Sequence, residues 1–85
     1  MQTTIRYFAS VREAVGCASE TVDLPDSVRT LADARAWLAA RSERHAAALG
    51  ATRVLRVACD HVMVAADAPL QPGRELAFFP PVTGG

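Results

Sequence analysis

One segment with helical periodicity lies between segments in which apolar and polar residues alternate, and this order limits how the 85 residues can fold. Apolar side chains recur at the spacing of one helix face: Val28, Leu31, Ala34 and Leu38. The opposite face would carry polar side chains to solvent: Arg29, Asp33, Arg35 and Arg41. This spacing predicts a main helix over about residues 28–40, with Ser27 as its N-cap. We expect a short helical extension over residues 42–50, closed by Gly50.

The flanking segments alternate with a period of two, which is typical of half-buried strands. We expect strands at residues 3–9, 19–24, 53–59, 62–64 and 74–79. A short helix, capped by Ser10 and stopped by Gly16, follows the first strand. Asp60-His61 suits a tight hairpin turn, because Asp favours turns.

This order of elements defines an α+β domain, in which a mixed sheet packs on one main helix. The fold is a β-grasp if the first and last strands lie parallel and adjacent at the centre of the sheet. Periodicity alone does not establish that pairing. We expect one β-grasp domain over residues 1–79 and a flexible, extended tail over residues 80–85.

Composition and motifs exclude several classes of function. The formal net charge is zero, so neither nucleic acid nor an anionic membrane is an expected partner. No apolar segment is long enough to span a bilayer and no signal peptide is evident, which predicts a cytoplasmic protein. Cys17 and Cys59 fit no metal-ligand spacing, and we expect no metal site. We interpret His45 as a solvated helix residue and His61 as a turn residue, and no catalytic motif is present.

Three large apolar residues fall on the polar face of their predicted strands. Phe8 has the same phase as the polar Arg6. Met63 and Phe79 likewise occupy the positions of their strands that face away from the predicted core. An apolar group gathered on the uncovered face of a sheet usually marks a partner site. Arg56 is expected to share that face with Arg6. We therefore predict a protein-binding surface there.

The last residues read FFPPVTGG and suggest a reactive tail. The six tail residues are Pro80, Pro81, Val82, Thr83, Gly84 and Gly85. Extended, they span roughly 20 Å, at about 3.3 Å per residue. The prolines favour an extended chain, and glycine, which lacks a Cβ, fits a narrow tunnel. A terminal carboxylate needs activation, most simply as an acyl-adenylate, before sulfur or an amine can capture it.

The chain resembles the small, sulfur-carrying subunit of molybdopterin synthase over essentially its whole length. The segments that carry the resemblance are YFASVREAVG near the start and DAPLQPGRELAFFPPVTGG at the end. The resemblance implies a ubiquitin-like β-grasp fold. It also implies that Phe8, Arg12, Met63 and Phe79 contact the partner. Asp60-His61 departs from the family, which often has Asn followed by a polar residue.

The same resemblance implies the chemistry and the partners. An adenylating enzyme of the ubiquitin-activating type would use ATP and Mg to activate Gly85, and a sulfurtransferase would help convert it to a thiocarboxylate (1-thioglycine). The tail would then enter the large subunit of a heterotetramer. There the sulfur would pass to cyclic pyranopterin monophosphate and form the molybdopterin dithiolene. This chain would itself bind no cofactor.

Two other functions stay open on the residues alone. A ubiquitin-like protein modifier would also end in Gly84-Gly85, although the chain has no lysine to receive a bond from another copy. A sulfur carrier for thiamine-type biosynthesis would share the same ending, but the Phe-Phe-Pro-Pro segment before it is not typical of that class.

Overall fold

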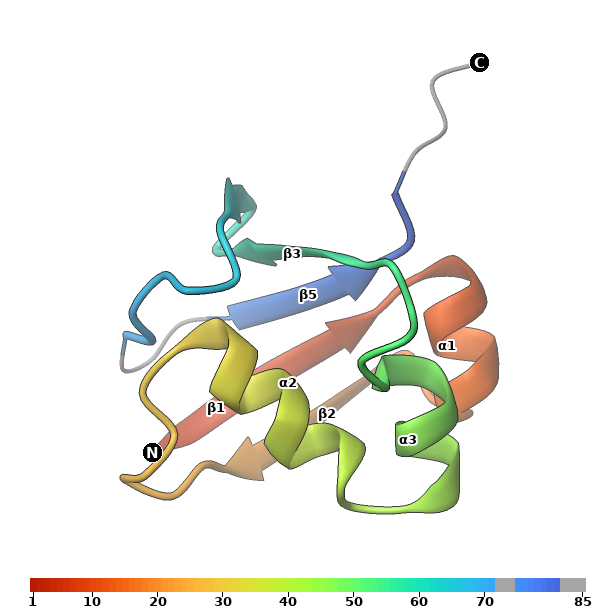
Figure 1. The fold of residues 1–85 in the computed structure, drawn as a ribbon, viewed down its shortest axis with the longest axis horizontal. Coiled ribbons are helices and arrows are strands. Elements are labelled where there is room, and N and C mark those ends of the chain that lie inside the picture. The colour runs from red at the N-terminus through yellow and green to blue at the C-terminus, as the bar shows by residue number, and fades with distance from the viewer. Residues whose placement is uncertain (72–74, 82–85) are drawn as a thin grey trace.

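A computed structural model describes residues 1–71 and 75–81 of the chain (Figure 1). Within these ranges the elements follow in the order β1 (Gln2–Tyr7), α1 (Ala9–Val15), β2 (Ser19–Asp23), α2 (Leu31–Ala39), α3 (Glu43–Leu49), β3 (Arg56–Cys59), β4 (Val62–Val64) and β5 (Glu75–Phe79). The helices and strands therefore occur in the predicted order. The predicted 42–50 extension of the main helix is a separate helix, α3.

The strands of the described ranges form one mixed sheet with the order β2-β1-β5-β3-β4. The first and last strands lie parallel at its centre, with Ile5 opposite Leu76 and Tyr7 opposite Phe78. The remaining pairs are antiparallel. This arrangement confirms the predicted α+β, ubiquitin-like β-grasp fold. The helices pack on one face of the sheet (Figure 1), which leaves the other face uncovered by helices.

The core lies between the sheet and the helices. Its largest fully buried apolar side chains come from both layers: Tyr7, Phe78, Ile5, Leu24, Leu31, Leu38, Leu49, Leu76 and Val11. Each such aliphatic or aromatic side chain contributes about 1.5–3 kcal/mol by leaving water. The alternation in β1 and β5 follows directly, because every second residue faces this core.

Helix α1 begins without the predicted Ser10 cap. Its N-cap is Phe8, which makes no side-chain hydrogen bond to the helix, and Ala9 adopts a positive φ of 51°. The end of the helix is as predicted: Gly16 has a φ of 96°, and its N–H donates to the Arg12 carbonyl at 2.9 Å. Glycine suits this left-handed position because it has no Cβ.

Helix α2 begins three residues later than the sequence predicted, and Ser27 is not its cap. Thr30 is the N-cap: its hydroxyl accepts from the Asp33 N–H at 3.1 Å, while the Asp33 carboxylate accepts from the Thr30 N–H at 3.2 Å. The next two N–H groups donate to carbonyls of the loop after β4. The Leu31 N–H donates to the Ala68 carbonyl, and the Ala32 N–H donates to the Ala66 carbonyl. These long-range partners fix where the helix begins.

Arg35 was predicted to extend into solvent, but the structure shows that its side chain contacts backbone carbonyls instead. Its guanidinium donates to the carbonyl of Leu49 at 2.7 Å and to that of Gly50 at 2.7 Å, and it also donates to the Arg53 carbonyl. These contacts cap the C-terminal end of α3, where carbonyl groups lack helical partners. Ser42 caps the other end of α3 by accepting from the His45 N–H.

The β3–β4 hairpin has the predicted turn. Asp60 and His61 have φ values of 50° and 70°, which matches the two positive φ angles of a type I′ turn. The turn sets the register in which Ala58 pairs with Met63 and Val57 with Val64. The strand itself is shorter than predicted, because β3 begins at Arg56 and not at residue 53.

Candidate interaction surface

The three out-of-phase residues lie where the alternation placed them. Phe8 is 42% exposed and Met63 is 49% exposed, whereas Phe79 is half-buried. Arg6 and Arg56 are exposed at positions of the same phase. We call these five residues the outer patch: they belong to the sheet face that the helices leave uncovered.

Strand register brings the outer patch together from separate parts of the chain. Arg56 pairs with Phe79 across β3 and β5. The Phe8 and Phe79 rings meet edge to face, with centroids 6.5 Å apart. The Arg6 guanidinium lies 5.5 Å from the Phe8 centroid and also forms an ion pair with Glu75 at 3.7 Å. Aromatic rings and arginines in such contact are enriched at protein interfaces.

The start of the tail lies beside this patch. Pro80 and Pro81 follow β5 directly. Because β5 runs parallel to β1, both strands finish at the same end of the sheet. There the Phe8 N–H donates to the Phe78 carbonyl at 3.2 Å. The other predicted tail residues, Val82, Thr83, Gly84 and Gly85, lie outside the described residues.

Arg12 is exposed on α1, one turn after Phe8. The Arg12 N–H donates to the Phe8 carbonyl at 3.3 Å, which fixes the backbone of this turn beside the end of β1. Helix α1 also contacts β5. The structure thus brings Arg12 to the same end of the sheet as Phe8. Pro80 and Pro81, which we call the tail exit, lie at this end too.

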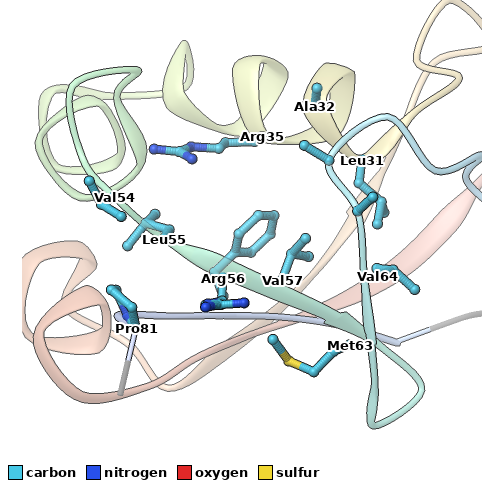
Figure 2. A pocket seen from close by; sticks show the side chains of 13 residues that line it. Leu31, Ala32, Arg35, Val54, Leu55, Arg56, Val57, Met63, Val64 and Pro81 are labelled. Atoms are coloured by element: carbon cyan, nitrogen blue, oxygen red, sulfur yellow. The ribbon is translucent and has the colours of Figure 1, made fainter. Parts of the chain in front are cut away.

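A groove opens next to the patch, between α2 and the β3–β4 hairpin (Figure 2). It has a volume of about 570 Å³. Met63, Arg56 and Pro81 line it together with apolar residues from both sides: Leu31, Ala32, Val54, Leu55, Val57, Val64 and Phe78. Sequence reasoning missed this groove because its walls come from segments distant in the chain.

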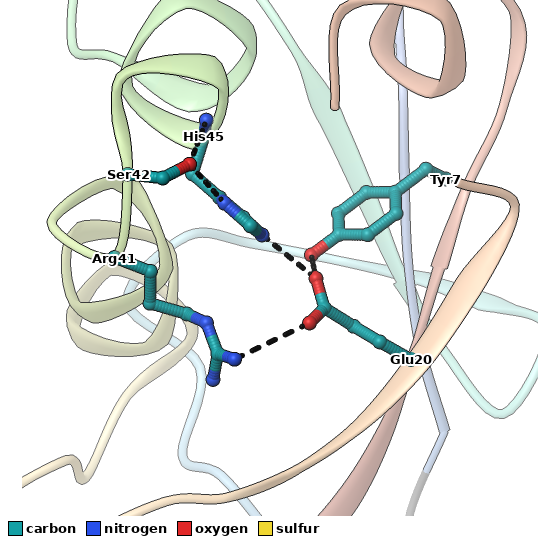
Figure 3. Close-up of polar contacts among 5 residues, drawn as sticks. All are labelled: Tyr7, Glu20, Arg41, Ser42 and His45. Atoms are coloured by element: carbon teal, nitrogen blue, oxygen red, sulfur yellow. Dashed lines mark hydrogen bonds and ion pairs between the residues drawn. The ribbon is translucent and has the colours of Figure 1, made fainter. Parts of the chain in front are cut away.

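A polar cluster on the helix-covered side was also missed (Figure 3). The Glu20 carboxylate accepts from the Tyr7 hydroxyl at 2.7 Å, bonds His45 Nε2 at 2.8 Å and pairs with Arg41 at 3.5 Å. Ser42 Oγ lies 2.7 Å from the other ring nitrogen of His45. The prediction of a solvated His45 was therefore wrong, since its side chain is only 14% exposed. Arg41 is likewise not wholly free in solvent.

The electrostatics of this cluster assign it a structural role. Partial burial opposes ionisation of Glu20, but hydrogen bonds from His45 and Tyr7 and the charges of His45 and Arg41 outweigh it, so the pKa of Glu20 falls. Burial and the bond to Glu20 raise the pKa of Tyr7, which stays a neutral donor. A satisfied network of this kind joins α3 and the end of α2 to the sheet.

Within residues 1–71 and 75–81, no three His, Cys, Asp or Glu side chains are placed to hold a metal ion. Cys17 is an exposed free thiol, and Cys59 is half-buried at the margin of the core. In the part of the chain that the structure describes, no helix has the length and apolar character needed to cross a membrane.

Comparison with known proteins agrees with this fold. The family model described as the ThiS family matches residues 5–85. The chain therefore belongs to the ThiS family. Among its relatives is the molybdopterin synthase sulfur carrier subunit of Escherichia coli, which is 41% identical over 81 residues, or 95% of this chain and 96% of the relative.

Solved structures show the same architecture. SAMP1 from Haloferax volcanii matches with a TM-score of 0.76 and 28% identity, covering all of both chains. A chain in the complex of subunits 1 and 2 of the molybdopterin-converting factor from Helicobacter pylori matches with a TM-score of 0.66 and 24% identity, again over both full lengths. At that identity, the second likeness concerns the fold alone.

Proposed function

We propose that the chain is the sulfur carrier and small subunit of molybdopterin synthase, with Gly85 carrying the sulfur. The observation that supports this most strongly is the 41% identity to the Escherichia coli sulfur carrier subunit over nearly the whole of both chains. The family match extends through Gly85. The adjacent outer patch and tail exit support the same function.

In this proposal the outer patch docks the large subunit of the synthase. Phe8 and Met63 supply exposed apolar surface, and the half-buried Phe79 ring packs against Phe8. Phe and Met are frequent at interfaces. Arg12 lies at the same edge and would pair with an acidic group of the partner. Because Pro80 and Pro81 leave the sheet beside this patch, docking directs residues 82–85 into the large subunit, which supplies the catalytic pocket.

The chemistry would take place at the Gly85 carboxylate. Its oxygen attacks the α-phosphorus of ATP on the activating enzyme, and pyrophosphate leaves. Sulfur delivered at the sulfide level by a sulfurtransferase then attacks the acyl carbon, AMP leaves, and the thiocarboxylate forms. In the large subunit this sulfur bonds to a side-chain carbon of cyclic pyranopterin monophosphate as the C–O bond to an oxygen substituent of that carbon breaks; water then hydrolyses the resulting thioester, which leaves the sulfur on the pterin and releases Gly85 as the carboxylate. Two such transfers complete the dithiolene.

Intact mass spectrometry tests this proposal. The protein is incubated with its activating enzyme, ATP, Mg and a sulfur source, and omission of ATP serves as the control. We expect the mass gain that results from replacing one oxygen atom by sulfur, located at Gly85 by fragmentation. No gain with any activating enzyme of the source organism would contradict the proposal.

The likeness to SAMP1 and to small archaeal modifier protein 1, both of Haloferax volcanii, favours a second function as a ubiquitin-like modifier. The same mass experiment separates the two when cell extract is added. A modifier forms amide bonds to lysines of other proteins and gives a ladder of heavier species, whereas a sulfur carrier gives only the thiocarboxylate.

A further inference from the structure

The segment before β3 has a free backbone edge. Directly after β3, the Asp60 N–H donates to the Glu75 carbonyl at 2.9 Å, so the β3 residues in phase with Asp60 hydrogen-bond to β5. The β3 residues of the opposite phase hydrogen-bond to β4. This β3–β4 pairing ends at Val57 and Val64. By this alternation the N–H and C=O of Leu55 point away from β5. No backbone hydrogen bond of Leu55 is recorded within the described ranges.

The free edge borders the groove described above. Val54 lies on the rim and is 77% exposed, and Leu55, Val57 and Val64 line the walls (Figure 2). After Val64 the chain turns toward α2, where the Ala66 carbonyl binds the first turn of the helix. Residues 54–55 therefore have no β4 partner and border the groove.

The charges lining the groove are all positive. Arg35 and Arg56 are its charged residues, and no carboxylate lines its described part. Arg35 is engaged with three backbone carbonyls. The Arg56 guanidinium makes no hydrogen bond or ion pair in the described part of the chain. An apolar occupant that carries a carboxylate near Arg56 would complement this groove.

We propose that an extended, apolar segment of the large subunit, carrying a carboxylate, adds as a strand to the free edge at Leu55 and fills this groove. The inference rests on the proposed function and adds a second contact region to it. A strand fits better than a helix, because only an extended backbone satisfies the N–H and C=O of Leu55 while side chains enter the groove. Met63, Arg56 and Pro81 belong both to the groove lining and to the outer patch or tail exit, so one partner can cover both.

A matched pair of substitutions tests the groove. Val54→Asp places a carboxylate on its apolar rim, and Val62→Asp makes the same change at another exposed valine, which lies outside this groove. Both sites are exposed, so the melting temperature of each variant is expected to stay near that of wild type. Binding of the large subunit of the source organism, measured by calorimetry, is expected to weaken by about tenfold or more for Val54→Asp only.

Amide hydrogen exchange supplies a readout at the backbone. The Leu55 amide is expected to exchange rapidly in the free protein and to become protected in the complex with the large subunit. Concentration-dependent protection in the free protein would instead show that a second copy occupies the edge, and would overturn the proposal.

The Phe79→Ala variant separates this inference from the proposed function, because Phe79 lies in the outer patch and outside the groove lining. If the wild-type chain does not bind the large subunit, both proposals fail. If Phe79→Ala weakens binding while Val54→Asp does not, and Leu55 stays unprotected in the complex, only the groove proposal is overturned.

Discussion

At the scale of single residues, Glu20 contacts polar side chains from three separate parts of the chain. Its carboxylate forms hydrogen bonds with Tyr7 of β1 and His45 of α3. It also forms an ion pair with Arg41, from the segment that joins α2 to α3. Hydrogen bonds to a charged group are worth more than neutral ones, about 1.5–3 kcal/mol each. Glu20 therefore acts as the link between the sheet and the helical layer.

We predict that Glu20→Gln lowers the free energy of unfolding at pH 7 by about 1–2 kcal/mol, because the neutral amide replaces a charged acceptor. The folded state lowers the pKa of Glu20, so its stabilisation is present above the unfolded value of about 4.3 and is lost as pH falls through the folded value. Urea denaturation of wild type and variant from pH 7 to pH 3 measures this difference, which should shrink in acid.

Glu13→Gln is the control for this prediction, since Glu13 is exposed on α1. It should change the free energy of unfolding little at any pH. A wild-type advantage over Glu20→Gln that stayed constant down to pH 3 would mean that the contribution of Glu20 does not depend on its charge.

At the scale of elements, the beginning of α2 shows how a helix boundary is chosen. Ser27 and Thr30 are both acceptable N-caps by residue type. Thr30 has Asp33 three residues later, which completes a reciprocal capping box. The loop after β4 supplies carbonyls for the next two N–H groups. Together these partners satisfy the first turn of a helix that begins at Leu31.

Thr30→Ala is expected to destabilise the protein by about 1 kcal/mol, because the Asp33 N–H loses its acceptor. For a domain of this size that corresponds to a fall in melting temperature of about 4–8 °C. Ser27→Ala is the matched control, since Ser27 lies in an exposed turn before the helix. Equal losses for the two variants, measured by thermal denaturation, would show that the cap is not at Thr30.

At the scale of the whole molecule, the core of the described residues closes before the chain reaches Pro80. The buried residues of the described ranges lie between Thr3 and Phe78. The β1–β5 pairing joins the two ends of this part at the centre of the sheet. The tail residues 80–85 thus follow a core that is already closed, which is the arrangement expected when docking and sulfur transfer are assigned to different parts of one chain.

Deletion of Gly85 is predicted to abolish molybdopterin formation by the reconstituted synthase while leaving the melting temperature unchanged, because the proposed sulfur-bearing group is removed and the core is not. Binding to the large subunit through the outer patch should persist in part, which separates a loss of chemistry from a loss of docking. Molybdopterin formation at the wild-type rate by the deleted protein would rule out Gly85 as the sulfur carrier.

Local patterns in the sequence determined the order of the elements, the α+β class and which strand residues face away from the core. Alternation placed Phe8, Met63 and Phe79 opposite the core, since successive side chains of a strand face opposite sides. The left-handed end of α1 was visible at Gly16, and the hairpin turn at Asp60-His61, because both depend on the conformational preferences of residues in place.

The tertiary structure alone decided the features that need partners distant in the chain. His45 is drawn into the helix–sheet boundary by Glu20, 25 residues away. Arg35 turns to carbonyls 14–18 residues further on. The groove at Val54 and Leu55 exists because β4 ends early and its loop crosses to α2. Such contacts depend on how whole elements pack in space, and patterns among neighbouring residues do not determine that packing.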